Sequence, residues 1–553
     1  MKSLLKFCQL STVICQLFSC LLLFSCSSKK QADTILHHGV VYTVDDKFSV
    51  AEAIAVKDGK ILAVGTNDDI LKQYEAKEVI DLDGKTVFPG FIDAHAHFWG
   101  YGMGLQECNL VGTNSWEEIT DKLKKFSEEN KEGWLVGRGW DQNDWTVKQF
   151  PGKEKLDELF PDRPVLLTRV DGHAAIANQK ALDISGVEAG DKLTGGEVEV
   201  KGGKLTGILI DNATSLVENN IPAPTAKYIK EALIDAQQNC LAVGLTTIDD
   251  CGLNYDAVEF IDSLQKRGDL KMRLYVMLSD AAKNYEYIFK KGKIKTDRLN
   301  VSSFKVYADG ALGSRGACLL QPYSDKPGHY GFLLSRPEHF DSVAKVIYEH
   351  NFQMCTHAIG DSGNRTILNI YAKYLKGKND RRWRIEHAQV INQNDFKLFG
   401  ENNVLPSVQP THATSDMYWA ADRLGKERVK GAYAYKQLLQ QNNILPLGTD
   451  FPVEDINPLN TFYAAVARKD KKRFPEDGYQ FENALSREEA IKGMTIWAAY
   501  SNFEEKQKGS IEVGKLADFV ILDKDLLKCA ENEILQAKVL FTYVNGQKLY
   551  SFR

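Results

Sequence analysis

The chain has 553 residues, of which 43% are hydrophobic and 26% charged, with a formal net charge of -5 at neutral pH. This composition is typical of a globular protein and excludes a fibrous or a disordered chain. The length leaves room for added modules beside a barrel of roughly 250 residues, so we expect more than one domain. Because charges of both signs are mixed and no basic stripe stands out, we expect a small-molecule partner and no nucleic acid.

The first residues are typical of a segment that directs export. Lys2 and Lys6 precede an apolar run over 10–24, which is too short and too often interrupted by polar residues for a permanent membrane span of ~20 residues. The run closes on Leu23-Phe24-Ser25-Cys26, which resembles the bacterial lipobox, where the cysteine is lipidated and becomes the mature N-terminus.

We therefore predict a lipoprotein signal peptide over 1–26 and a polar tether over 27–33. Lipidation at Cys26 would anchor the protein in the bacterial cell envelope, on the periplasmic or the surface side, and this anchor would be its one contact with a membrane. A plain signal peptide that happens to contain cysteines is the alternative, and it too takes the protein out of the cytoplasm.

Both ends of the remaining chain are rich in short strand-like segments. Residues 34–87 contain several such segments and the hairpin signal Asp58-Gly59. Residues 505–553 show the same pattern of short strand-like segments, and Asn545-Gly546 lies between two of them. We predict that both termini together form one small β-sandwich.

The middle of the chain, over 88–504, alternates apolar strand-like runs with charged, helical segments, which is the pattern of parallel βα units. Eight runs are candidate barrel strands: 86–95, 244–250, 273–280, 301–310, 352–360, 383–390, 403–411 and 443–450. A ninth run, over 164–173, lies between the first two, and we assign it to an inserted α/β segment over about 107–225. The predicted fold class is α/β, with a (β/α)8 TIM-type barrel, the β-sandwich and this insertion after the first strand.

Side chains that bind metals fall at the C-terminal ends of these runs, where barrel enzymes build their active sites. His95 and His97 are one residue apart, so in an extended strand both point to the same face and can bind one ion. His357, His387 and Asp450 close three later runs. The alternatives are a chance HxH motif and core histidines bonded to backbone carbonyls, but four of the 11 histidines close predicted barrel strands. The set favours a shared metal site.

Several ordered motifs point to a family. The set PGFIDAHAH, a strand lysine, the strand-end His, His and Asp, and the closing GSIEVGKLADFVILD resembles the amidohydrolase superfamily. The strings GWDQNDW, DGHAAIAN, FKVYADGALGSRGA, THAIGD, RIEHAQ and GTDFPV are similar to its amidohydrolase family 3, which includes N-substituted formamide deformylases. The likeness covers nearly all of the mature chain. It implies a (β/α)8 barrel with a companion β-sandwich and a centre of one or two divalent metal ions, with zinc as the expected metal.

The resemblance also implies a role for each metal-binding residue. The more buried ion would be bound by His95, His97 and Asp450, and the more exposed one by His357 and His387. Lys305 matches a strand lysine that many relatives convert to N6-carboxylysine, because an ammonium repels cations whereas a carbamate offers them two anionic oxygens. The alternative is a buried Lys305 paired with a carboxylate such as Asp309, for which a single ion is the simpler expectation.

The chemistry expected of such a centre is hydrolysis by a water that the metal activates, since a bound metal lowers the pKa of water from 15.7 towards ~7. Asp450 would act as general base and acid, taking a proton from the water and delivering it to the leaving nitrogen. His387 or a donor from the insertion would stabilise the developing oxyanion. Candidate substrate-binding residues, for which local turns and hydrogen bonds are the alternative role, are Trp140, Asp141, His173, Arg315 and His412.

Three functions stay open. The first is hydrolysis of a C–N bond in a small N-acyl or N-formyl substrate, and the second is ester, lactone or deaminating hydrolysis at the same centre, because fold does not determine function. The third is a binding lipoprotein that has lost catalysis, against which the complete set of strand-end histidines and Asp450 argues. A homodimer is also left open.

Overall fold

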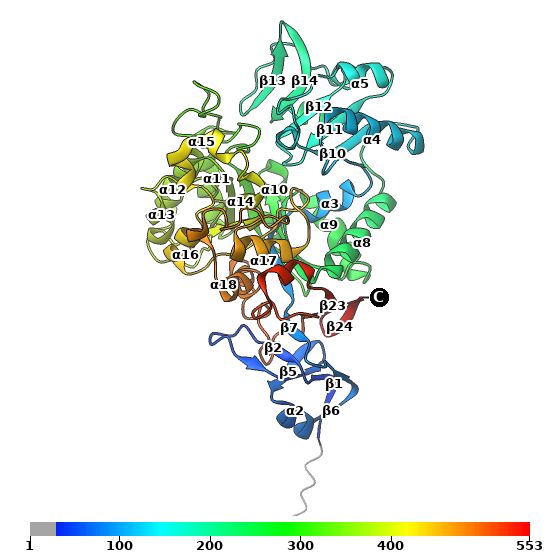
Figure 1. Cartoon of the computed structure of the whole chain (residues 1–553), viewed down its shortest axis with the longest axis vertical. Coiled ribbons are helices and arrows are strands. Elements are labelled where there is room, and N and C mark those ends of the chain that lie inside the picture. The colour runs from blue at the N-terminus through cyan, green and yellow to red at the C-terminus, as the bar shows by residue number, and fades with distance from the viewer. Residues whose placement is uncertain (1–28, 553) are drawn as a thin grey trace, which may run out of the picture.

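The computed structural model describes residues 29–552, which form a central barrel, a β-sandwich and a third sheet (Figure 1). The predicted signal peptide and its lipidation site, Cys26, lie outside the described residues. Within 29–552, no helix combines the length and the apolar character needed to cross a membrane.

Seven parallel strands form most of the barrel. In their order around the sheet they are β21 (Leu405–Ser407), β20 (Arg384–His387), β19 (Gln353–Ala358), β18 (Leu299–Tyr307), β16 (Arg273–Ser279), β15 (Leu245–Leu253) and β8 (Phe91–Ala96). Every neighbouring pair is parallel. Nearly all of their residues are buried, as expected for strands with helices outside and packed side chains within. The predicted α/β barrel is confirmed.

The segment that closes the barrel between β21 and β8 is not a regular strand, contrary to the strand predicted over 443–450. The amide of Gly448 donates to the carbonyl of Val408 at 3.0 Å, and the amide of Ala94 donates to Leu447 at 3.1 Å. Pro446 has no amide hydrogen to donate to a ladder. The closing segment therefore joins its two neighbours by isolated hydrogen bonds.

The run predicted as one strand over 86–95 is two strands in different sheets. β7 (Thr86–Pro89) pairs with the sandwich strand β22 (Phe519–Leu522), and β8 enters the barrel immediately after Gly90. A Cβ at Gly90 would overlap the side chain of Thr246, so the chain passes from one sheet to the other where only glycine fits.

Helices cover the outside of the barrel. The longer ones are α8 (Ala226–Ala242), α9 (Tyr255–Lys266), α10 (Ala282–Lys291), α11 (Pro337–Glu349), α12 (Asp361–Tyr374), α15 (Ala420–Arg428), α16 (Tyr435–Asn442) and α17 (Pro458–Ala467). The shorter ones are α3 (Phe98–Gly104), α13 (Phe396–Glu401), α14 (Pro410–Asp416), α18 (Arg487–Gly493) and α19 (Ile496–Ser501). Buried residues of α12 such as Asn364, Ile367, Leu368 and Tyr371 recur every three or four positions, which places one apolar face on the barrel.

Two sheets form the β-sandwich below the barrel in Figure 1. One runs β5 (Lys60–Gly65), β4 (Ala53–Lys57), β1 (Lys30–His37) and β6 (Tyr74–Asp81), with α2 (Asn67–Gln73) between β5 and β6. The other combines both termini and runs β24 (Gln547–Ser551), β23 (Val539–Val544), β22, β7, β2 (Val40–Tyr42) and β3 (Val50–Ala51). Leu36 and Ile54 of the first sheet share a core with Val87 and Phe519 of the second.

Both predicted hairpin turns of the sandwich are confirmed. Asp58 and Gly59 have φ of 49° and 74°, and Asn545 and Gly546 have φ of 52° and 67°. Two successive residues with positive φ are what a two-residue hairpin turn requires. Residues 30–33, predicted as part of a tether, are instead the first half of β1, which pairs in parallel with β6.

The inserted segment forms the third sheet, at the opposite end of the barrel from the sandwich (Figure 1). Its strands run β13 (Gly196–Lys201), β14 (Lys204–Asp211), β12 (Ala174–Ala177), β11 (Val165–Arg169), β10 (Leu135–Trp140) and β9 (Cys108–Asn109). Its helices are α4 (Trp116–Glu129), α5 (Glu154–Leu159), α6 (Gln179–Ser185) and α7 (Ser215–Glu218). The run predicted over 164–173 lies in this sheet as β11 and the turn that follows it.

Candidate metal centre

Metal-binding side chains meet at the C-terminal mouth of the barrel. His95 lies near the end of β8, Lys305 near the end of β18, His357 near the end of β19 and His387 at the end of β20. Asp450 lies in the closing segment, where its amide donates to the carbonyl of His95 at 2.8 Å. A cavity of about 300 Å³ opens from this cluster and is lined on another side by the inserted segment.

The candidate ligands are close enough to share an ion. His95, His387 and Asp450 are buried, and each offers a ligand atom within 4.8 Å of the other two. Oδ1 of Asp450 is 3.5 Å from Nε2 of His95 and 3.2 Å from Nε2 of His97. The rings of His357 and His387 have centroids 4.6 Å apart. The structure thus brings together the histidines and the aspartate that the sequence singled out, and such nitrogen and oxygen atoms suit zinc.

Three of these histidines are held by a neighbour at the ring nitrogen Nδ1. The contacts are 2.5 Å from His95 to Oε2 of Glu386, 3.1 Å from His97 to the carbonyl oxygen of Cys251, and 2.8 Å from His387 to Oε1 of Gln409. Acceptors at Nδ1 keep the proton there and leave the lone pair of Nε2 for a metal, as in known metal sites.

Burial keeps His95, His357 and His387 neutral. It lowers the pKa of His357 and His387 well below the usual range and, with the charge of Lys305, lowers that of His95 to about 4. Nε2 of His357 and Oδ1 of Asp450 are buried and have no hydrogen-bond partner among the described residues. Neutral imidazoles, a carboxylate and two unsatisfied buried atoms together fit a divalent metal ion.

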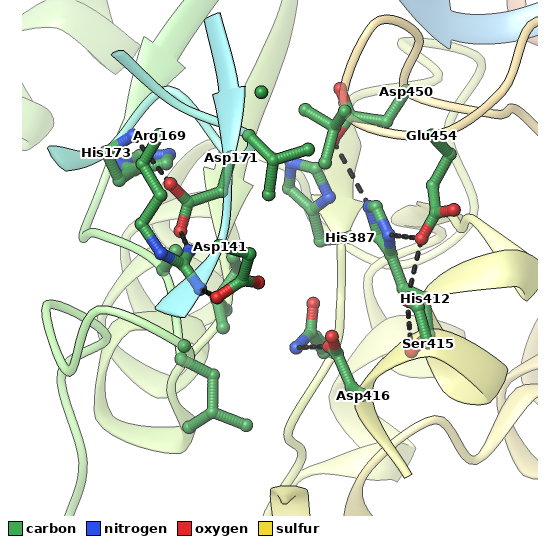
Figure 2. Close-up of a pocket in the computed structure, with 18 of the residues that line it drawn as sticks. Asp141, Arg169, Asp171, His173, His387, His412, Ser415, Asp416, Asp450 and Glu454 are labelled. Carbon is green, nitrogen blue, oxygen red and sulfur yellow. Dashed lines mark hydrogen bonds and ion pairs between the residues drawn. The ribbon is translucent and has the colours of Figure 1, made fainter. Parts of the chain in front are cut away.

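His412 connects Asp450 to Glu454 (Figure 2). Its Nε2 is 3.2 Å from Oδ2 of Asp450 and its Nδ1 is 3.2 Å from Oε1 of Glu454, which also accepts from Ser415 at 2.7 Å. Burial would lower the pKa of His412, but the two carboxylates raise it to about 10. Burial would likewise raise the pKa of Asp450, but the hydrogen bond from His412 and the nearby imidazoles of His97 and His95 hold it well below the usual range. Asp450 is therefore an ionised carboxylate.

Lys305 points toward the candidate ligands. It is 1% exposed, and its Nζ is 3.0 Å from Nε2 of His95. The pairing with Asp309 that the sequence left open is not formed, because the carboxylate of Asp309 accepts from three backbone amides at 2.8 to 2.9 Å.

The inserted segment supplies one side of the cavity. Figure 2 shows Asp141, Arg169, Asp171 and His173 on this side and His412 and Glu454 on the other. Arg169 forms ion pairs with both Asp141 and Asp171, so its charge is already satisfied. Of the predicted substrate-binding residues, the cavity lining contains Asp141, His173 and His412.

Two other predicted substrate-binding residues are not part of the cavity lining. Trp140 is fully buried in the core of the inserted segment, where its Nε1 donates to the carbonyl of Leu167 at 2.8 Å. Arg315 forms two hydrogen bonds with Asp325, of 3.2 and 2.8 Å. Packing inside the inserted segment holds Trp140 away from the cavity, and the ion pair with Asp325 holds Arg315 away from it.

Sequence reasoning missed Glu386, Gln409 and Arg169. Glu386 directly precedes His387 in a run that reads as a buried strand, and a charged residue at a buried position is a signal that could have revealed it. Arg169, in the strand-like run over 164–173, gave the same signal. Gln409 did not, because nothing local in the sequence connects it to His387.

The barrel and the cluster at its mouth define a metal-dependent hydrolase. The chain belongs to the amidohydrolase family, whose model matches residues 78–550, so the predicted family is confirmed. It is 34% identical over 544 residues to Protein LONG AFTER FAR-RED 3 of Arabidopsis thaliana, covering 94% of this chain and 92% of that protein. It is 25% identical to N-substituted formamide deformylase of Arthrobacter pascens, covering 94% and 98%. A crystal structure of an uncharacterized metal-dependent hydrolase from Pyrococcus horikoshii matches with a TM-score of 0.75 and 27% identity, covering 90% of this chain and 99% of that one.

Proposed function

We propose that this protein hydrolyses the C–N bond of a small N-acyl or N-formyl substrate, with zinc as its metal. The placement of Asp450 carries the proposal: its Oδ1 faces Nε2 of His95 and His97, and its Oδ2 is held by His412. This carboxylate lies beside both the candidate ligands and the cavity that would receive the substrate. The similarity to a relative named as an N-substituted formamide deformylase supports the choice of bond.

The chain's own residues would hold the metal as follows. The more buried ion would be bound by His95, His97 and Asp450, and the more exposed ion by His357 and His387. Carboxylation of Lys305 would add two oxygens next to His95 and favour two ions, whereas an unmodified lysine favours one. When bound, the metal supplies a water of lowered pKa and polarises the scissile carbonyl.

Asp450 would move the proton. It accepts the proton that water loses as the water oxygen bonds to the carbonyl carbon, and it returns this proton to the nitrogen as the C–N bond breaks. The products are a carboxylic acid and a free amine, and Asp450 is again ionised at the end. The hydrogen bond from His412 to Oδ2 keeps the carboxylate oriented and favours its ionised form.

A substrate panel tests the proposal. Zinc-loaded protein is assayed on N-formyl amines, N-acyl amines, esters, lactones and cyclic ureas, and its metal content is measured by elemental analysis. We expect one or two zinc ions per chain and the highest kcat/KM on the amides. Preference for esters, lactones or deamination would reassign the reaction, and a protein without metal or turnover after zinc supplementation would indicate a binding lipoprotein.

We also propose that a lipid on Cys26 anchors this enzyme in the bacterial cell envelope. The export-type segment and its lipobox-like end support this placement. In bacterial cells fed a labelled fatty acid, the wild type should carry label and sediment with membranes. Cys26→Ser should lose both properties, whereas Cys20→Ser should keep them, and label retained in Cys26→Ser would refute the anchor.

A further inference from the structure

One imidazole of the cavity has a nitrogen that no other group uses. Five histidines line the cavity: His97, His173, His357, His387 and His412. Three of them are candidate ligands, and His412 uses both ring nitrogens on Asp450 and Glu454. In the part of the chain that the structure describes, His173 forms a hydrogen bond through Nδ1 and none through Nε2. His173 is therefore the histidine that is open to a substrate.

Asp211 holds His173 in place. Nδ1 of His173 is 2.6 Å from Oδ1 of Asp211, whose side chain is fully buried. The amide of Asp211 also donates to the carbonyl of His173 at 2.9 Å, just beyond the paired residues Ala174 and Ile210 of β12 and β14. Asp211 has a φ of 50°, which is uncommon for a residue other than glycine and recurs at functional sites.

The barrel leaves space for the Asp211 carboxylate. Gly310 and Gly316 lie in the loop after β18, and a Cβ on either would overlap a carboxylate oxygen of Asp211. Oδ2 of Asp211 is buried and has no hydrogen-bond partner within residues 29–552. A buried carboxylate oxygen without a partner lowers stability. The contact between Asp211 and His173 therefore does not serve stability. It holds the His173 ring in position.

The His173 ring comes from the inserted segment and lies beside one of the candidate metal ligands. Its centroid is 5.0 Å from that of His357, a candidate ligand. His387 is a poor donor to a substrate, because its Nδ1 is engaged by Gln409 and it is itself one of the clustered ligands. The inserted segment thus brings a hydrogen-bond donor, His173, next to the candidate ligands, where the scissile carbonyl would lie.

We propose that Nε2 of His173 donates a hydrogen bond to the carbonyl oxygen of the substrate as negative charge develops there, and that Asp211 is its positioning residue. This inference rests on the proposed function. Because Asp211 engages Nδ1, Nε2–H is the donor that the ring presents, and no covalent bond of the ring changes. The inserted segment then completes the catalytic site, which the barrel strands alone would leave without this donor.

Kinetics of matched variants test this role. With the best amide of the substrate panel, His173→Ala should lower kcat by about 100- to 1000-fold, the range known for loss of one oxyanion donor, with little change in KM. His173→Gln should recover part of kcat, because its amide can still donate. Asp211→Asn and Gly316→Ala should lower kcat in the same way, while Gly104→Ala, at a glycine with open space around it, should match the wild type.

Metal content and melting temperature separate this role from a structural one. We expect zinc content and Tm of His173→Gln to equal those of the wild type. Wild-type kcat in His173→Ala, or loss of zinc in both His173 variants, would overturn the inference. A wild type that cleaves esters and no amide would refute the proposed bond alone, and the same variants assayed on the ester would then decide the role of His173.

Discussion

Nδ1 of His95 lies 2.5 Å from Oε2 of Glu386, and both side chains are completely buried. Oε1 of Glu386 is 2.7 Å from Nε of Arg384, which also pairs with Asp249 at 2.8 Å. Burial opposes the ionisation of Glu386, but Arg384 and His95 outweigh it and hold the pKa of Glu386 well below its usual range. An ionised carboxylate thus fixes the orientation of the His95 ring by binding Nδ1, the ring nitrogen that does not face the metal site.

Removing this charge should weaken metal binding. Glu386→Gln keeps the shape of the side chain but provides a weaker acceptor for His95, so we expect metal affinity to fall by about 10- to 100-fold. Competition with a chromogenic chelator measures the affinity, and Glu476→Gln at an exposed position should leave it unchanged. Equal affinities of Glu386→Gln and the wild type would show that Glu386 does not support the site.

Asp450→Asn should abolish most turnover. The amide cannot accept a proton, so we expect kcat to fall by about 100- to 10000-fold, the range of a lost general acid and base. Circular dichroism and zinc content accompany the kinetics, and Asp455→Asn on the exposed surface nearby is the control. Near-wild-type kcat in Asp450→Asn would remove Asp450 from the mechanism.

The stabilisation by His412 should depend on pH. Its pKa is raised in the folded state from 6.5 to about 10, so folding favours the protonated ring. The resulting stability is complete below about pH 6.5, decreases above it and is lost as pH rises through about 10. Urea unfolding of metal-free wild type and His412→Gln should show a difference in free energy that narrows over this interval. A difference that stays constant with pH would contradict the assignment.

A buried ion pair joins the barrel to the sandwich and should contribute to the stability of the fold. Arg273 of β16 donates to Asp518, which precedes β22, at 2.6 and 3.0 Å, and both side chains are at most 4% exposed. Asp518→Ala leaves the buried charge of Arg273 with neutral acceptors, the carbonyl of Asp297 and Oδ1 of Asn545, in place of a carboxylate. We therefore expect a loss of about 3 to 5 kcal/mol in the free energy of unfolding. Chemical unfolding measures it, and Glu401→Ala at the surface should cost little. A loss below about 1 kcal/mol would mean that water or another group replaces the pair.

The candidate ligands could be predicted because each is marked locally. His95, His357 and His387 stand at the ends of apolar runs, and a run of that kind already predicts a strand and its direction. The hairpin turns at Asp58 and Asn545 were predictable for the same reason, since two residues determine them. By contrast, Trp140 and Arg315 stand in equally suggestive motifs but lie outside the cavity lining, and their partners Leu167 and Asp325 cannot be predicted from the motif.

The sequence by itself determined the strand-and-helix alternation, the strand-end histidines and the family, all of which depend on residue type and spacing. Tertiary structure alone decided that Glu386 holds His95, that His412 joins Asp450 to Glu454 and that the barrel loop at Gly316 makes room for Asp211 beside His173. The physical reason is distance along the chain: His95 and Glu386 are 291 positions apart, and only the closure of the barrel brings them into contact.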